Sequence, residues 1–258
     1  MAIGKNVEFW EKALAAPFDL HVHSNFSDGA DSPRDIVLAA IDKGLKTIGF
    51  SDHSYIECDK EWCLAEDGAA EYKAAINALK AEFSGQIDIL CGIEQDFHTE
   101  LPAEGYDYVI GSVHHLFAGG EYIYMDETAE ILRAAANKHF GGDLLALCEA
   151  YFENVGQVYR KTGCDIVGHF DLLAKFNEKE PLFDEKNPRY VQAYRRAVDN
   201  LIADGCRVFE INFGAISRGY RTTPYPSEDI QSYIRERGGR FIFSSDSHAR
   251  ETVGYGFL

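Results

Sequence analysis

The segment DLHVHSNFSDG places two histidines, His21 and His23, on either side of one valine. Side chains at alternate positions of a β-strand point to the same face, so the two imidazoles would lie together if this segment is extended. Two imidazoles on one face form half of a metal site, because imidazole is a common ligand of Zn²⁺ and other transition metals. The pair therefore predicts a metal site, provided that other strands bring further ligands to it.

Further polar side chains stand where other short apolar runs end. They are Asp52 and His53 after TIGFS, Glu94 after ILCGI, His114 and His115 after YVIGSV, His169 and Asp171 after DIVG, Asn212 after VFEI, and Asp246 and His248 after FIFSS. A parallel α/β barrel gathers the carboxyl ends of its strands on one face. So many titratable groups would be costly to desolvate without a cation, and we therefore expect a metal centre on that face.

The elements that must position these residues alternate between short apolar runs and amphipathic stretches of helical period. The predicted strands are 17–22, 45–50, 87–94, 106–115, 165–170, 206–212 and 240–248, and the predicted helices are 32–44, 68–83, 143–163 and 188–205. This alternation favours a parallel sheet, and seven strands in 258 residues favour one TIM-like barrel domain over residues 1–258. A doubly wound open sheet is the alternative architecture.

Composition narrows the classes of partner. The net charge of −17 disfavours binding to a nucleic-acid backbone, and no apolar run reaches the length of a membrane span. The N-terminal residues lack the apolar core of a signal peptide. The six cysteines are scattered through apolar segments without a C-x-x-C pair, so we expect reduced thiols and a cytoplasmic location.

The donor types indicate which metals the site would hold. Imidazoles and carboxylates without a thiolate suit Zn²⁺, Mn²⁺ or Fe²⁺. About nine donors are too many for one ion, so we expect two or three divalent ions, with a carboxylate such as Glu94 bridging two of them. Two metals ~3.5–4 Å apart clamp a bridging hydroxide that attacks phosphorus, which is the machinery of phosphoester hydrolysis.

These residues resemble the PHP (polymerase and histidinol phosphatase) family, and within it the monofunctional histidinol-phosphate phosphatases. The resemblance rests on motifs in order along the chain: DLHVHSNFSDG, FSDHS, GIEQDF, YDYVIGSVHH, DIVGHFDLLAKF, FEINFGAISRG, PYPSEDI and SSDSH. It implies a distorted (β/α)7 barrel with three metals, and hydrolysis of L-histidinol phosphate to L-histidinol and phosphate in histidine biosynthesis. It also implies the ligands: His21, His23, Glu94 and Asp246 for one metal, Glu94, His114 and His169 for a second, and Asp28, His53 and His248 for a third.

Two positions within this ligand set carry further expectations. Many family members have histidine where this chain has Asp28, and a hard carboxylate there would weaken the third site or favour Mn²⁺ or Fe²⁺. Adjacent strand residues face opposite ways, so His114 and His115 cannot both point at the metals. The family motif ends in SVH, which favours His114 as the ligand.

A phosphate ester also needs cationic partners from the protein. Arg218 and Arg221, in GAISRGYRTT, follow the sixth predicted strand and are our main candidates for phosphate binding. Lys175 and Arg250 are weaker candidates that also fit solvated surface charges. Glu94 and Arg218 are the candidate catalytic residues, joined by Asp171 as an acid or base or, equally, as a structural support.

Other functions fit parts of the pattern. A PHP-type enzyme could act on another small phosphate ester or a nucleotide, and metal-dependent amidohydrolases also begin with H-x-H but commonly bridge their metals with a modified lysine. A proofreading nuclease would need basic surface, and a non-catalytic barrel would lack ligands. Only ten residues follow His248, so we expect the last barrel helix to be short or missing. The sequence leaves the oligomeric state open.

Overall fold

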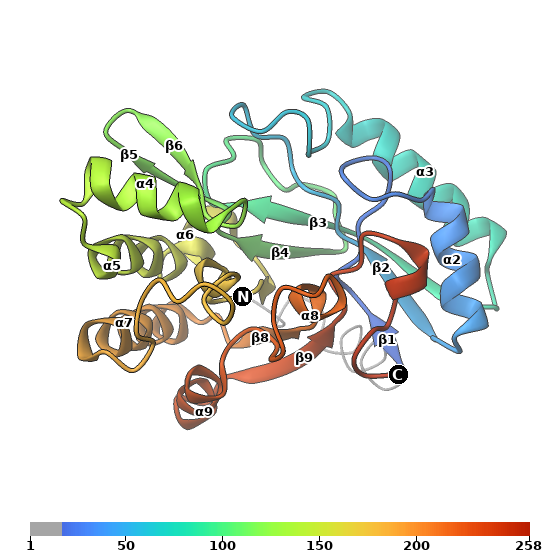
Figure 1. Ribbon diagram of the computed structural model, residues 1–258. Helices are drawn as coiled ribbons and strands as arrows, with labels where there is room; N and C mark the ends of the chain where they lie inside the picture. The colour runs from blue at the N-terminus through green and yellow to red at the C-terminus, as the bar shows by residue number, and fades with distance from the viewer. Residues whose placement is uncertain (1–16) are drawn as a thin grey trace.

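The computed structural model describes residues 17–258, which form a nearly closed barrel of seven parallel strands (Figure 1). The strands follow one another around the barrel in chain order: β1 (Phe18–Asp19), β2 (Thr47–Phe50), β3 (Asp88–Asp96), β4 (Tyr108–Ser112), β7 (Ile166–Val167), β8 (Val208–Asn212) and β9 (Arg240–Ser244). Each neighbouring pair is parallel. The predicted TIM-like barrel is confirmed. The open-sheet alternative is wrong, because a doubly wound sheet reverses its strand order and this sheet does not.

Helices cover the outer face of the barrel (Figure 1). The helices of the described chain are α2 (Pro33–Asp42), α3 (Ala69–Glu82), α4 (Ala129–His139), α5 (Leu144–Val155), α6 (Val158–Thr162), α7 (Pro188–Asp204), α8 (Gly214–Ser217) and α9 (Glu228–Glu236), with one-turn 3-10 helices η1 (Leu172–Ala174) and η2 (Arg250–Thr252). The short α8 is an exception to the outer position, because it lies at the carboxyl ends of the strands, with Gly214 against Asp246. The apolar faces of the helices and the strands form the main buried core. None of the helices within residues 17–258 is long and apolar enough to cross a bilayer.

A second, smaller apolar cluster fills the barrel interior below the site. Its members come from around the whole barrel: Leu20, Leu90, Tyr108, Ile110, Ile166, Val208 and Ile242. Tyr108 lies across this interior, and its hydroxyl donates to the carbonyl oxygens of Leu20 at 2.7 Å and Phe50 at 3.1 Å. A Cβ atom at Gly92 would lie 2.3 Å from the Tyr108 ring, so glycine is needed beside it. Because inward positions alternate, the next inward residue of β3 after Gly92 is Glu94.

The barrel closes between β9 and β1 without a regular strand pair. A single bridge joins Val22 to Ser247, and the backbone N–H of His23 donates to the Ser247 carbonyl at 2.8 Å. The buried carboxylate of Asp19 completes the join. It accepts hydrogen bonds from the Ser245 amide and hydroxyl at 3.2 and 2.5 Å, and from the Gly254 amide at 2.8 Å. One side chain thus replaces the missing ladder bonds.

Most predicted helices are confirmed, but the single helix predicted over 143–163 is wrong. The Ser32 hydroxyl caps α2 by accepting from the Asp35 amide at 3.3 Å, and Pro33 occupies its first position, as predicted. The segment 143–163 instead forms α5 and α6, separated at Gly156. Glycine is a poor helix former, so the helix breaks at Gly156 although the apolar pattern continues past it.

The sequence interpretation also missed an antiparallel hairpin, β5 (His115–Ala118) and β6 (Glu121–Tyr124), which follows β4. Gly119 and Gly120 connect the two strands, both with positive φ. Two glycines between short strands are a hairpin signal, because such turns need positive φ at both central positions. After the hairpin come α4 and α5, which the structure packs against each other.

The described chain has no α-helix after β9. The one-turn helix η2 lies against α2 instead. The Lys43 ammonium group, at the end of α2, donates to the carbonyl oxygens of Glu251 at 2.6 Å and Val253 at 2.8 Å. These contacts, with the Asp19–Gly254 bond, hold the final residues over the join between β9 and β1.

We expect Asp19→Ala to lower the free energy of unfolding by about 2–4 kcal/mol, because it leaves buried donors at Ser245 and Gly254 without an acceptor. Asp19→Asn keeps one acceptor oxygen and should cost less. Urea unfolding followed by circular dichroism measures both, with the exposed Asp42→Ala as a control within about 0.5 kcal/mol of wild type. Equal effects of Asp19→Ala and Asp42→Ala would show that Asp19 does not close the barrel.

Candidate metal centre

The predicted metal ligands converge at the carboxyl ends of the barrel strands. Their ligand atoms form four groups in which every atom lies within 4.8 Å of the others: His23, Asp28, His53 and His248; His21, Glu94 and His169; His21, His23 and Asp246; and His53, Glu94 and His114. Each of the residues predicted as ligands belongs to at least one group. Within residues 17–258 these groups contain no other side chain.

Glu94 lies at the centre of these groups, with its two carboxylate oxygens facing different imidazoles. Oε2 is 3.2 Å from Nε2 of His21 and 3.0 Å from Nδ1 of His53. Oε1 is 3.0 Å from Nε2 of His169 and 3.5 Å from Nε2 of His114. A carboxylate placed in this way can bridge two metal ions, one on each oxygen.

Two aspartates complete the groups on the side away from Glu94. Asp246 Oδ1 is 3.8 Å from Nε2 of His21 and 3.5 Å from Nε2 of His23. Asp28 Oδ2 is 2.9 Å from Nε2 of His248 and 3.7 Å from Nε2 of His53. Asp246 has a φ of 50°, the one positive value outside glycine in the described chain, and aspartate is among the residues that tolerate it.

The donor set fits bound cations. Several of its buried atoms have no hydrogen-bond partner within the protein: Nε2 of His21, both ring nitrogens of His23, Oε2 of Glu94 and Nδ1 of His169. Buried polar atoms are rarely left unsatisfied, because each costs about 1–3 kcal/mol. Divalent cations would bind Nε2 of His21, one ring nitrogen of His23 and Oε2 of Glu94 and would balance the carboxylates, so the residues present suit the metal centre that the sequence predicts.

The electrostatics of the protein without metal show how crowded the charges are. Burial, aided by neighbouring His248 and His53, lowers the pKa of His23 to about 3. Burial also opposes charge on His53, but Glu94 and Asp28 outweigh it and raise its pKa to about 10. For Asp28, burial favours the neutral form, yet the imidazoles of His53 and His248 hold its pKa below the usual range. The imidazoles and carboxylates of the site therefore shift one another's pKa values strongly at the place where cations would bind.

Three supporting carboxylates surround the ligands, and two of them, Glu210 and Asp96, were missed by the sequence interpretation. Glu210 Oε2 is 2.8 Å from Nδ1 of His21, and its Oε1 accepts from the His169 amide at 2.5 Å. Asp96 Oδ2 accepts from the His114 amide at 2.9 Å and lies 3.2 Å from its Nδ1. Such carboxylates orient an imidazole and select its tautomer. Both were detectable, because each lies two residues from a strand-end polar residue on the inward face.

The third is Asp52, which holds the loop that carries Asp28. Its carboxylate accepts from the amides of Ser24 at 2.9 Å and Ser27 at 3.1 Å, and from both serine hydroxyls. The polar residues of SNFSDG therefore serve the loop geometry. Asp28 reaches the other ligands because Asp52 fixes the turn before it.

Arg218 is the predicted phosphate-binding residue that the structure brings to the ligands. Its Nη1 donates to the Asp246 carbonyl at 2.9 Å and lies 2.8 Å from Nδ1 of His248, while Nη2 lies 3.2 Å from Asp246 Oδ2. About 31% of its side chain is exposed. A guanidinium at this edge adds positive charge where an anionic ligand would enter.

Arg221 and Asp171 lie together in a buried region behind the site. Arg221 stacks 4.7 Å from the centroid of the Tyr225 ring and pairs with Glu178 at 3.5 Å. Asp171 accepts from the Ser227 amide at 3.0 Å, and burial raises its pKa to about 6 against the opposing charge of Arg221. Oδ1 of Asp171 and both Nε and Nη1 of Arg221 have no hydrogen-bond partner in the described structure, so the predicted roles of the two residues stay predictions.

The two weaker candidates have different surroundings. Lys175 is largely buried and donates to the Asp126 carbonyl at 2.7 Å and carboxylate at 3.0 Å. Arg250 is exposed and pairs with Asp31 and Glu251, as a surface charge would. Because Asp126 lines the cavity beside the ligands, Lys175 lies near the site. The side chain of Arg250 forms ion pairs with Asp31 and Glu251 in the described structure, away from the ligands.

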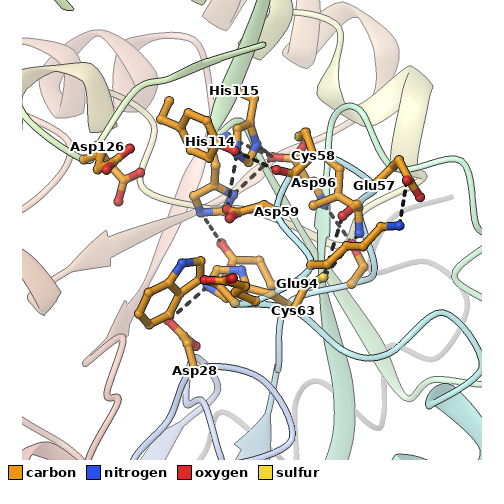
Figure 2. Close-up of a pocket in the computed structure, with 18 residues that line it drawn as sticks. Asp28, Glu57, Cys58, Asp59, Cys63, Glu94, Asp96, His114, His115 and Asp126 are labelled. Carbon is orange, nitrogen blue, oxygen red and sulfur yellow. Dashed lines mark hydrogen bonds and ion pairs between the residues drawn. The ribbon is translucent and has the colours of Figure 1, made fainter. Parts of the chain in front are cut away.

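A cavity of about 670 Å³ opens beside the ligands (Figure 2). Asp28, His53, Glu94 and His114 line its inner end, and Ser54 and residues 56–63 line its outer part. His114 joins the metal-binding groups, whereas His115 begins β5 and lies 3.4 Å from Asp59 and 3.6 Å from Asp96. Both imidazoles line the cavity and contact Asp96 Oδ2, so the two histidines do not face opposite ways, although only His114 belongs to the groups of candidate ligands.

The chain is similar in sequence and in fold to proteins named as histidinol-phosphatases. A protein of Deinococcus radiodurans named "Probable histidinol-phosphatase" is 32% identical over 93% of this chain and 89% of its own length. The histidinol-phosphatase of Bacillus subtilis is 24% identical over 93% of this chain and 96% of its own length. The histidinol phosphate phosphatase of Lactococcus lactis, solved with zinc, L-histidinol and phosphate, superposes with a TM-score of 0.66 at 23% identity, covering 91% of this chain and 87% of that protein.

The PHP domain family matches residues 19–212, a range that runs from the first strand to the end of β8. It includes the H-x-H pair, Glu94, His114 and His169, which the structure gathers at the strand ends. The fold of the solved relative is the same barrel. The chain belongs to the PHP family.

Proposed function

We propose that this protein is a metal-dependent phosphomonoesterase that hydrolyses L-histidinol phosphate to L-histidinol and phosphate, a step of histidine biosynthesis. The observation that carries the proposal is the Glu94 carboxylate between two sets of buried imidazoles, with Arg218 at the edge of the same site. Relatives named as histidinol-phosphatases align with nearly the whole chain. One of them shares 32% of its aligned residues with it.

Two or three divalent ions, Zn²⁺, Mn²⁺ or Fe²⁺, would occupy the site. The residues we assign to hold them are those in the four groups of ligand atoms described above, with Glu94 shared between two ions and Asp28 in the third position. When bound, such ions supply Lewis acidity and lower the pKa of coordinated water. The Glu94 carboxylate lies between the two sets of imidazoles, in the bridging position that amidohydrolases commonly fill with a modified lysine.

The residues of the chain have separate roles in this proposal. Arg218 binds the phosphoryl oxygens and stabilises negative charge that develops on them in the transition state. Glu210 and Asp96 hold His21 and His114 in the required orientation, because each carboxylate lies within 3.2 Å of a ring nitrogen. Asp171 and Arg221 support the loop behind Arg218.

A small-molecule substrate fits the surroundings better than a polynucleotide. The chain has a net charge of −17, and acidic residues line the outer part of the cavity, so a phosphate backbone would be repelled. We also propose a cytoplasmic location, since all six cysteines are free thiols in the structure.

The substrate assignment predicts that the purified protein, supplied with Mn²⁺, Zn²⁺ or Fe²⁺, releases phosphate from L-histidinol phosphate and loses this activity with a chelator. Re-addition of metal should restore it, because the ligands are side chains of the folded barrel. A colorimetric phosphate assay measures the rate. If nucleotides or sugar phosphates turn over much faster than L-histidinol phosphate, the reaction class survives and the substrate assignment is wrong.

We expect Glu94→Gln to lower kcat/KM for L-histidinol phosphate by roughly 10³-fold or more, because one residue serves two metal positions. Glu100→Gln, a matched change at an exposed position just beyond β3, should leave the rate near that of wild type. Metal content by mass spectrometry should fall in Glu94→Gln alone. Equal rates of phosphate release in wild type and Glu94→Gln would rule out this mechanism.

A further inference from the structure

The cavity continues outward from the metal centre into a strongly acidic region. Beyond the ligands, its lining includes the carboxylates Glu57, Asp59, Glu61, Asp96, Asp126 and Glu127, with Lys60 as the one lysine or arginine of the lining. The same cavity contacts Glu94 and His114, so a molecule bound at the metals extends into this region. The proposed substrate has an anionic phosphate at one end, which these carboxylates would repel from the outer part.

Part of this acidity is balanced within the protein. Glu57 pairs with Lys60 at 2.6 Å, and Asp126 pairs with Lys175 at 3.0 Å. In contrast, nothing among residues 17–258 gives Glu61 or Glu127 a cationic partner. The outer part therefore carries uncompensated negative charge.

His115 marks the innermost point of this acidic region. It is 2% exposed, lines the cavity, and neither of its ring nitrogens has a hydrogen-bond partner. Its Nε2 is 3.4 Å from Asp59 and its Nδ1 is 3.6 Å from Asp96. One imidazole therefore faces two carboxylates, of which Asp96 also contacts His114 and, among the described imidazoles, Asp59 contacts His115 alone. Figure 2 shows Asp59 and His115 beside the cavity, close to the metal-site residue His114.

Trp62 adds an aromatic surface to the same wall. Its side chain lines the cavity and is 58% exposed, which is unusual for a residue with so large an apolar area. Tyr124 also lines the cavity and is fixed by its hydroxyl, which donates to the Cys58 carbonyl at 2.6 Å. Aromatic faces attract cations and stack on planar rings.

We infer that residues 58–62 form a subsite for the alcohol part of the substrate, in which the Asp59 carboxylate pairs with a positive charge and Trp62 covers an adjoining ring. The inference rests on the proposed function, because it takes the phosphate to lie at the metal centre. It defines the substrate class as phosphate monoesters whose alcohol carries a cationic amine or imidazolium. Uncharged alcohol groups would gain nothing from Asp59, Glu61 or Glu127.

The test uses the metal-loaded full-length protein and two probes, L-histidinol and inorganic phosphate, each titrated by calorimetry. Asp59→Asn should weaken L-histidinol binding by about 10- to 100-fold, because it removes a charge partner at a partly buried site. Trp62→Leu should weaken it by about 3- to 30-fold. Neither variant should change the dissociation constant of inorganic phosphate by more than about twofold, because phosphate is taken to bind at the metal centre.

Glu66→Gln is the matched control, since Glu66 is an exposed carboxylate of the same segment outside the cavity lining. Unchanged L-histidinol binding in Asp59→Asn and Trp62→Leu would overturn the subsite, as would an equal loss in the binding of inorganic phosphate. Failure of the proposed function looks different: wild type would release no phosphate from L-histidinol phosphate. The binding measurement needs no turnover, so it decides on the subsite in either case.

Discussion

The buried carboxylate of Glu94 has five imidazoles within 3.5 Å, those of His21, His23, His53, His114 and His169. Several of the ring nitrogens and one of the Glu94 oxygens have no hydrogen-bond partner within the protein. A fold that relied on its own residues alone would not tolerate so many unsatisfied groups at the end of its core. The requirement for cations at this point accounts for most of the polar architecture around it.

The barrel supplies these groups through one repeated rule, inward alternation along parallel strands. In β3 and β8 the inward positions begin with an apolar residue, Leu90 or Val208, and reach the site as Glu94 or Glu210. The same strands therefore build the dry interior and the polar site above it. Closure by Asp19 matters for this reason, because it holds β9 and its following Asp246 against β1 and His21.

The sequence was sufficient to predict the barrel and the residues that converge at its open end, since both follow from strand periodicity and parallel connection. Glu210 was not predicted as a site residue, because it lies inside the apolar run VFEI and not at its end. Arg221 could not be placed, because its stacking on Tyr225 depends on how the loop after β8 folds over the barrel. The hairpin at Gly119 and Gly120 was detectable from its turn residues, whereas the break between α5 and α6 lay within an apolar pattern that continues through Gly156.

We propose that the enzyme binds the phosphate of its substrate at the metal centre and the alcohol part against the acidic, aromatic wall of the cavity. The central claim is that Glu94 joins two metal ions. A crystal structure of the metal-loaded protein with phosphate, with anomalous scattering recorded at the metal absorption edges, tests it directly. The account predicts at least two anomalous peaks, with one oxygen of Glu94 bound at each of two peaks and Arg218 on the phosphate. A single peak, or metals that Glu94 does not contact, would contradict it.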